Sequence, residues 1–365
     1  MKVAIDISQS IYGTGVSVYT LNLVASLIRQ FPNDQFVVFG GSLRRKKELE
    51  RVAKRLKTTS HIYSFPPRLM DFVWNSLHVL PVERLVGNVD LVHTSDWTEP
   101  PSSLPKVTTV HDLIPFKYPS KTHDVVRGAH KKRLSWVTRE SQGIIAVSQS
   151  TKQDLVSILK VPEDKITVIY EAAESFYSPQ PPAMINNIKR KYKLNSDYLF
   201  SLSTVEPRKN QVGLIKAFQL VKQKHPNLKL IIGGKTGWGE ELEIPEDVIF
   251  PGFIPNADLP ALYSGCLAYV LPSFYEGFSL SHLSAMACGA PVVASNISSM
   301  PEVVGAAGVL VDPKDTQSIA AGIMKAIKNR ADLSKKSLER SKEFTWAKAA
   351  KQTHDLYKEI LSNQP

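Results

Sequence analysis

Short hydrophobic runs alternate with longer stretches of helical periodicity along almost the whole chain. Apolar runs bounded by turn residues are typical of buried strands. The pattern predicts strands at residues 2–7, 35–39, 61–64, 90–93, 107–110, 143–147, 166–169, 198–202, 228–232, 248–250, 267–271, 292–294 and 308–311. Strands that alternate with helices are typical of parallel sheets covered by helices, so the pattern predicts an α/β protein.

The segments between these strands carry apolar residues three and four positions apart, as on the buried face of a helix. Helices are expected from the loop at 12–15 to about residue 29, and at 44–57, 69–80, 123–140, 149–159, 210–224, 257–264, 279–287, 315–328 and 332–344. A final amphipathic segment follows at 344–361 and ends the chain.

A proline-rich segment, SPQPPA at residues 178–183, interrupts this alternation and is the best linker in the chain. The strand and helix alternation restarts after it. The sequence therefore predicts two doubly wound, Rossmann-like domains with a cleft between them. A single β/α barrel fits less well, because the spacing is unequal and the linker falls in mid-chain.

Length and composition agree with two domains, since 43% of the 365 residues are hydrophobic. No run of 18 apolar residues occurs and the first ten residues lack the profile of a secretory signal, so we expect a cytoplasmic protein without a transmembrane helix. The two cysteines, Cys266 and Cys288, are expected to be buried thiols rather than a disulfide or a metal pair.

The net charge of +11 is spread along the chain. Residues 1–175 carry 23 Lys and Arg against 17 acidic residues, and residues 176–365 carry 22 against 17. No nucleic-acid-binding domain stands out from this distribution. Two clusters, at 44–57 and 127–133, are either solvated helix faces or a peripheral contact with an anionic membrane or a phosphate-bearing acceptor.

Two cations, Arg208 and Lys209, follow the predicted strand 198–202 and precede a helix. Arg208 offers a planar fork for phosphate oxygens and Lys209 a point charge, so the pair suits a diphosphate. The alternative is a pair of solvated side chains at a helix start. Asn210 is expected to cap the helix in either case.

Two further loops lie at strand exits on the ligand edge of the sheets. Residues 12–15, YGTG, allow close approach of an anion to the backbone, although Val18 breaks the dinucleotide fingerprint and a plain tight turn is equally compatible. His111 follows the strand 107–110 and could bind a sugar hydroxyl or act as an acid or base, or else bond local backbone.

The stretch at 272–296 joins a strand exit, a loop with Glu276 and the start of a helix. Glu276 is expected beside the cations, with the amides of Phe278, Ser279 and Leu280 at the helix N-terminus. A carboxylate among sugar hydroxyls can accept two hydrogen bonds and so distinguish epimers.

Several segments together resemble the retaining glycosyltransferases of family 4, which have the GT-B fold. The resemblance rests on PRKN at 207–210, LPALYS at 259–264, PSFYEGF at 272–278, AMACGAPVV at 285–293 and MPEV at 300–303. It extends to HDL at 111–113, AVS at 146–148 and FTW at 344–346, and so covers nearly the whole chain.

The resemblance implies a domain at 1–175 that binds the acceptor, a domain at 176–345 that binds the nucleotide-sugar donor, and a last helix at 346–365 that packs back on the first domain. It further implies metal-independent, retaining transfer of a hexose-type sugar from a UDP-, GDP- or ADP-sugar to a lipid-linked or polysaccharide acceptor, as in cell-envelope polysaccharide biosynthesis. A nucleotide sugar is then a co-substrate, and neither a cofactor nor a metal is required.

The resemblance also implies residue roles. Arg208 and Lys209 would hold the diphosphate, Glu276 and the amides at 278–280 the donor sugar, and the backbone at Phe253 and Ile254 the base. Gly15 would close over the phosphate from the other domain, and His111 would lie by the transferred sugar.

One position departs from the family pattern. The second carboxylate of the family motif, which binds the ribose hydroxyls of the donor, falls at Ser284, and Ser279, Ser281 and His282 also replace the usual residues. Losing hydrogen bonds to a charged group costs on the order of 1.5–3 kcal/mol. The alternative to an active transferase is therefore a GT-B protein with weakened or lost turnover that acts as a binding or scaffolding module. A third reading, a sugar-nucleotide epimerase, lacks an added acid/base constellation.

Overall fold

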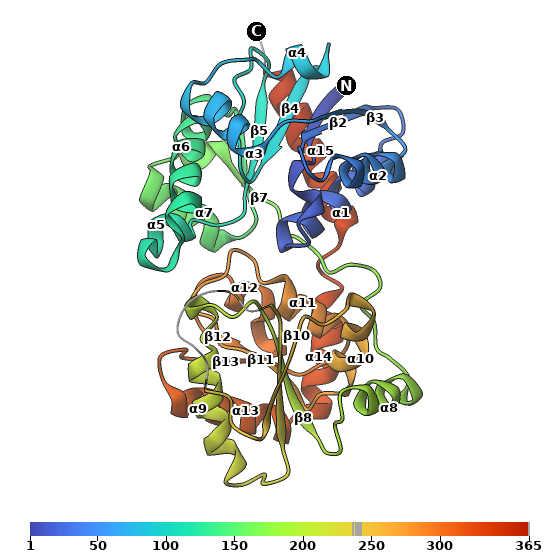
Figure 1. Ribbon diagram of the computed structural model, residues 1–365, viewed down its shortest axis with the longest axis vertical. Helices are drawn as coiled ribbons and strands as arrows, with labels where there is room; N and C mark the ends of the chain where they lie inside the picture. The colour runs from blue at the N-terminus through green and yellow to red at the C-terminus, as the bar shows by residue number, and fades with distance from the viewer. Residues whose placement is uncertain (236, 238–242, 364–365) are drawn as a thin grey trace. The chain divides into compact units, whose positions relative to one another are not determined.

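The computed structural model describes residues 1–235, 237 and 243–363, and these form two compact units. Unit 1 comprises residues 1–172 together with the C-terminal segment from Thr345, and unit 2 comprises residues 173–344. Within each unit a parallel sheet carries helices on its faces (Figure 1).

The sheet of unit 1 has seven parallel strands in the order β3-β2-β1-β4-β5-β6-β7. The strands are β1 Lys2–Asp6, β2 Gln35–Gly41, β3 Thr59–Tyr63, β4 Leu91–Ser95, β5 Lys106–Val110, β6 Gly143–Ala146 and β7 Ile166–Val168. The strand order reverses between β1 and β4, so the carboxyl ends of these two strands flank the crevice where open α/β sheets bind ligands.

The described helices of unit 1 are α1 Gly15–Gln30, α2 Lys46–Leu56, α3 Pro67–Met70, α4 Glu83–Val86, α5 Ile114–Lys117, α6 Asp124–Glu140, α7 Gln149–Leu159 and α15 Trp346–Ser362. Short turns of other helix types lie at Ser8–Ile11, Asp71–Ser76, Pro119–Lys121 and Glu163–Lys165. Apolar side chains of the sheet and helices pack into core clusters, among them one around Phe39 and Trp74 and one around Leu134 and Ile144.

The last helix, α15, belongs to unit 1 although it follows unit 2 in the chain. It packs along α1, where the ring of His354 stacks on Phe31 at a centroid distance of 3.5 Å and its Nε2 lies 2.6 Å from Asp34. In the core the Tyr357 hydroxyl bonds His93 Nδ1 at 2.5 Å. α15 is thus bonded to unit 1 through buried side chains.

In the described part of unit 2, the sheet has six parallel strands in the order β10-β9-β8-β11-β12-β13. The strands are β8 Tyr198–Leu202, β9 Lys229–Gly233, β10 Val248–Gly252, β11 Ala268–Leu271, β12 Val292–Ser295 and β13 Val309–Val311. The order reverses between β8 and β11, and these are the strands whose exits carry Arg208, Lys209 and Glu276.

The described helices of unit 2 are α8 Pro182–Lys191, α9 Gln211–Lys222, α10 Leu259–Gly265, α11 Leu280–Ala287, α12 Met300–Val304, α13 Thr316–Lys328 and α14 Arg330–Ser341. Short 3₁₀ turns lie at Pro207–Lys209, Asn256–Asp258 and Gly305–Ala307. Two apolar clusters form the core, one around Phe200 and Tyr263 and one around Phe218 and Ile323.

All of the strands predicted from the hydrophobic pattern are present, within two residues at each end. One helix prediction was wrong, and the linker predicted at 178–183 overlaps a helix. The helix expected at 69–80 ends at Ser76, and His78 and Leu80 have positive φ angles of 52° and 67° that no helix accommodates. The segment after residue 181, interpreted as linker, begins helix α8, because Pro182 occupies the first helical turn where its missing N–H costs nothing.

Candidate functional site

Two cations stand at the exit of β8 in unit 2. The chain leaves β8, makes a 3₁₀ turn at Pro207–Lys209 and enters α9. Asn210 occupies the junction with φ 58°, and its side chain does not cap α9 as expected. Instead its amide donates to the carbonyls of Pro272 and Pro313 at 3.1 and 2.7 Å. Asn210 therefore ties the loop that carries the cations to the loop that carries Glu276.

Glu276 lies against both cations. Its carboxylate oxygens are 2.7 and 2.9 Å from Lys209 Nζ and 3.1 Å from Arg208 Nη1. Arg208 also pairs with Glu206 and donates to the Tyr275 carbonyl at 2.6 Å. The three charged residues that the sequence predicted for one site are brought together.

The charges of this cluster depend on one another. Burial alone would raise the pKa of Glu276, but the charges of Lys209 and Arg208 overcome this effect and lower the pKa to about 2. Burial lowers the pKa of the Lys209 ammonium, and the neighbouring Arg208 lowers it further, while Glu276 acts in the opposite direction. With Glu206, the cluster holds two cations and two carboxylates, so an anionic ligand would bind the cations in competition with the carboxylates.

The backbone of Glu276 is held by two serines that the sequence analysis did not identify. Ser298 Oγ and Ser299 Oγ donate to the Glu276 carbonyl at 2.7 and 2.9 Å, and the Glu276 amide donates to Ser298 Oγ at 3.2 Å. Ser298 takes a positive φ of 58° to do so. A serine pair just after a strand, here β12, is the signal that could have found them.

The predicted amide donors lie where α11 begins. Phe278 is buried against Phe344, Ser279 is the N-cap residue and Leu280 is the first helical residue. Ser279 has a φ of 84°, which is unfavourable for a residue with a Cβ. Its hydroxyl bonds Nδ1 of the buried His282, whose ring packs edge-on against Tyr269. Burial lowers the pKa of His282 to about 4, so this ring is neutral near pH 7.

Ser284, at the position that departs from the family pattern, is buried on α11. Burial raises the pKa of the Tyr177 phenol, and the nearby Ser284 side chain opposes this rise. The Tyr177 ring packs edge-on against Tyr263 at 5.9 Å. No sequence motif marks Tyr177, which lies just before α8.

Phe253 and Ile254, which the resemblance assigns to the base, follow β10. The Phe253 ring is 63% exposed and Lys235 Nζ lies 5.5 Å from its centroid, whereas Ile254 is buried in the core. Their contact with a base stays a prediction.

Unit 1 contains the two other predicted residues. Gly15 begins α1, whose N-terminus is closed by a capping box between Thr14 and Ser17. His111 follows β5, with Nε2 2.9 Å from Ser95 Oγ and Nδ1 3.2 Å from Glu171 Oε1. His111 thus bonds side chains rather than backbone through both ring nitrogens. Ser95 and Glu171 were missed because they lie 16 and 60 positions away along the chain.

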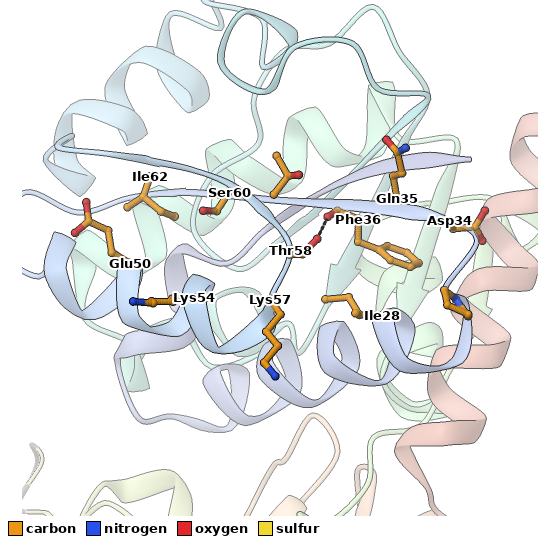
Figure 2. A pocket seen from close by; sticks show the side chains of 12 residues that line it. Ile28, Asp34, Gln35, Phe36, Glu50, Lys54, Lys57, Thr58, Ser60 and Ile62 are labelled. Carbon is orange, nitrogen blue, oxygen red and sulfur yellow. Dashed lines mark hydrogen bonds between the residues drawn. The ribbon is translucent and has the colours of Figure 1, made fainter.

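A groove of about 1010 Å³ lies at the opposite, amino edge of the sheet of unit 1, between α1, α2 and the strands β2 and β3 (Figure 2). It contains none of the residues predicted for the site. Its lining residues are Ile28, Pro32, Asp34, Gln35, Phe36, Glu50, Lys54, Lys57, Thr58, Thr59, Ser60 and Ile62.

The residues that the structure describes contain neither a metal-binding cluster nor a membrane-spanning helix. No group of three or more His, Cys, Asp or Glu side chains among them is arranged to hold a metal ion. None of the described helices combines the length and the apolar character needed to cross a membrane. Cys266 and Cys288 are both buried free thiols, as expected.

The chain matches two descriptions of glycosyltransferase families. Residues 13–173 match Glycosyltransferase Family 4, and residues 184–344 match Glycosyl transferases group 1. The O-antigen chain mannosyltransferase B of Escherichia coli is 35% identical over 69% of this chain and 70% of its own length. The protein therefore belongs to the group 1, family 4 glycosyltransferases, and it is a transferase of this class.

Two further comparisons bear on function and fold. The serotype-specific mannosyltransferase WbdA of Escherichia coli is 30% identical over 75% of this chain, and the chain spans about a third of WbdA, 37% of its length. The structure of Anabaena Alr3699/HepE in complex with UDP-glucose superposes with a TM-score of 0.73 over 98% of this chain and all of the other, at 18% identity. The expected GT-B fold, two Rossmann-like domains with parallel sheets, is confirmed.

Proposed function

We propose that this protein is a metal-independent, retaining hexosyltransferase that transfers mannose from a nucleoside-diphosphate donor to a growing cell-envelope polysaccharide or its lipid-linked precursor. The observation that carries this proposal is the cluster of Arg208, Lys209 and Glu276 at the switch point of the unit 2 sheet. Mannose and a glycan acceptor are supported by the O-antigen mannosyltransferase relative, and a nucleotide sugar by the UDP-glucose complex of a structural neighbour.

The two cations hold the donor diphosphate. Arg208 presents two donors in one plane and Lys209 a compact charge, and both lie on loops fixed by side-chain bonds to neighbouring backbone. As the bond from the sugar to the diphosphate breaks, negative charge grows on the leaving oxygen and both cations stabilise it. We infer metal independence from this arrangement, because the cations supply the charge that a divalent metal would otherwise supply.

Glu276 and the start of α11 recognise the donor sugar. Once the diphosphate has bound Arg208 and Lys209, the Glu276 carboxylate is available to accept hydrogen bonds from two sugar hydroxyls. The backbone amides at Phe278, Ser279 and Leu280 are further donors to the sugar. We assign the backbone at Phe253 and Ile254 to the base, and Gly15 and His111 of unit 1 to the phosphate and the transferred sugar. Unit 1 binds the acceptor.

A panel of nucleotide sugars tests this proposal. Purified protein is incubated with GDP-mannose, UDP-glucose, UDP-galactose or ADP-glucose, with and without EDTA, and release of nucleoside diphosphate is measured. We expect turnover with a mannose donor that EDTA leaves unchanged, and an R208A/K209A variant without turnover. A protein that neither binds nor hydrolyses any nucleotide sugar contradicts the proposal.

The alternative of weakened turnover rests on Ser284. Serine is too short to replace the ribose-binding carboxylate of the family, and its side chain lies near the Tyr177 phenol. We infer that Ser284 and Tyr177 form a rearranged, working donor site. Ser284→Glu then lowers turnover. Tighter donor binding with new activity in S284E would instead identify an impaired protein.

We also propose a peripheral contact with an anionic membrane, with the reaction on the cytoplasmic side. Helix α2 exposes Lys47, Arg51 and Lys54 on one face. The second basic cluster is smaller than the sequence indicated, because Arg133 is buried, with its Nε 3.8 Å from Glu99 Oε2. Lys131 and Lys132 remain exposed there.

A further inference from the structure

Three strand exits of unit 1 place Ser95, His111 and Glu171 in a line of contacts. Ser95 ends β4, His111 follows β5 and Glu171 follows β7, and parallel strands bring their carboxyl ends to one edge of the sheet. The Ser95 hydroxyl is 2.9 Å from His111 Nε2, and Glu171 Oε1 is 3.2 Å from His111 Nδ1. The side chains of His111 and Glu171 are 12% and 5% exposed.

The contacts determine where the imidazole carries its proton. A carboxylate can only accept hydrogen bonds, so the nitrogen that faces Glu171, Nδ1, carries the hydrogen. In the neutral ring Nε2 is then bare and accepts the hydrogen of the Ser95 hydroxyl. Glu171 therefore fixes the tautomer that carries its hydrogen on Nδ1, and the Ser95 hydroxyl donates a hydrogen bond to Nε2.

The ring is also held on its face. Tyr19 of α1 packs edge-on against it, with centroids 4.8 Å apart at 84°. The Tyr19 hydroxyl bonds Thr109 Oγ1 at 2.7 Å, and Thr109 in turn bonds His93 Nε2 at 2.8 Å. His93 is the residue that α15 contacts through Tyr357. The orientation of His111 is thus determined by α1, by the strand ends and by the bonded network beneath them.

We propose that Glu171 and Ser95 are positioning residues that keep His111 as a hydrogen-bond acceptor, so that this pair meets a sugar hydroxyl rather than a phosphate oxygen. While Ser95 donates to Nε2, its hydrogen is used, and a ligand that reaches the pair encounters the lone pairs of Ser95 Oγ. These lone pairs accept a hydrogen bond, which a sugar hydroxyl can supply and an ionised phosphate oxygen cannot. The inference rests on the proposed function for the identity of the sugar, but the positioning itself does not.

Nitrogen NMR of the protein labelled with ¹⁵N in its histidine rings tests the positioning without turnover. The His111 signals are assigned by comparison with His111→Asn. At pH 8 we expect a protonated Nδ1 and a bare Nε2 in the wild type and in Glu171→Asp, and a changed tautomer mixture in Glu171→Ala. The control is Asp34→Asn, which alters the His354 pair on α15 and leaves the His111 signals unchanged.

An Nε2-protonated or doubly protonated ring in the wild type overturns the positioning, as does an unchanged tautomer in E171A. These outcomes do not depend on activity. If the wild type turns over no nucleotide sugar, the proposed function fails while the NMR result still decides whether Glu171 and Ser95 set the ring.

Kinetics test the ligand chemistry. We expect Glu171→Gln and Ser95→Ala to lower kcat by about 10- to 100-fold, the loss typical when a residue that orients a metal-binding histidine is replaced, with KM for the nucleotide sugar unchanged. E171D should recover part of this loss. GDP, which lacks the transferred sugar, should bind all variants equally. Weaker GDP binding in E171Q or S95A would mean that the pair meets the diphosphate and would overturn the assignment to a hydroxyl.

Discussion

In the donor site that we propose for unit 2, Glu276 links phosphate binding to sugar recognition. Its carboxylate is shared between Lys209 and Arg208, so an incoming diphosphate competes with it for the same two cations. The carboxylate also repels the phosphates at short range. Removing the negative charge of Glu276 should therefore strengthen binding of the nucleotide and slow transfer of the sugar.

We expect Glu276→Gln to bind a nucleoside diphosphate about three- to tenfold more tightly than the wild type, and to lose about 100-fold or more in kcat. Calorimetric titration with GDP or UDP measures the first effect and product release the second. The matched control is Asp258→Asn, which removes a carboxylate that pairs with Lys191 at another place in unit 2. Weaker nucleotide binding in E276Q would show that Glu276 supports the phosphate site instead of competing for it.

Asp6 provides a pH-dependent prediction in unit 1. Burial raises the pKa of Asp6 to about 6, and the charge of Asp96 adds to the rise, against two hydrogen bonds from Ser8. A raised carboxyl pKa contributes stability that is complete below about pH 4 and is lost as the pH rises through about 6. Asp6→Asn cannot ionise. Its free energy of unfolding should exceed that of the wild type by about 1–3 kcal/mol at pH 8 and match it at about pH 4. Urea unfolding at both pH values measures this, and an equal gain at both values would rule out ionisation as the cause.

In helix α13, close packing against the sheet requires a glycine. A Cβ at Gly322 in α13 would overlap Val311 Cγ1 of β13 and lie 3.3 Å from Val293 Cγ1 of β12. Alanine favours a helix by about 1 kcal/mol over glycine, but overpacking costs about 1–3 kcal/mol. We therefore expect Gly322→Ala to destabilise the protein and Val311→Ala to relieve part of the loss in the double variant. Gly128→Ala in α6, where the Cβ meets nothing within 4 Å, is the control and should stabilise. Urea denaturation measures all four variants, and a stabilised G322A would contradict the packing argument.

At the element scale the sequence predicted strands better than helices, for a physical reason. A buried parallel strand is a continuous apolar run, which turn residues delimit clearly, and each predicted strand is present. Helical spacing reports a period but not continuity. After Ser76 the chain turns, and the His78 ring stacks on Trp136 and lies 2.8 Å from Glu140. These partners are distant in sequence, so no local pattern could reveal that the helix stops.

At the candidate site, local motifs predicted some residues, whereas contacts between residues distant in sequence could not be predicted. Arg208, Lys209 and Glu276 could be predicted because each lies at a strand exit within a recognisable motif. The pairing of Glu276 with both cations, and the serines that hold its backbone, depend on which strands are neighbours in the sheet. Ser95 and Glu171 carry no motif at all, and only the order of β4, β5 and β7 brings them to His111.

At the scale of the whole molecule, the net charge of +11 favours approach to any anionic surface, so a membrane contact must be separated from this general attraction. Lys47, Arg51 and Lys54 are spaced so that they share one exposed face of α2. We expect the protein to cosediment with vesicles that contain anionic lipid, less so in high salt, because exposed charges are screened beyond about 10 Å at 0.1 M.

The variant K47E/R51E/K54E should lose most of this binding. The variant K335E/K336E/K342E changes three exposed lysines of unit 2 and the net charge by the same amount, and should keep most of it. If both variants lose binding equally, the attraction comes from net charge and α2 is not the contact. Binding of the wild type that high salt does not weaken would exclude an electrostatic contact altogether.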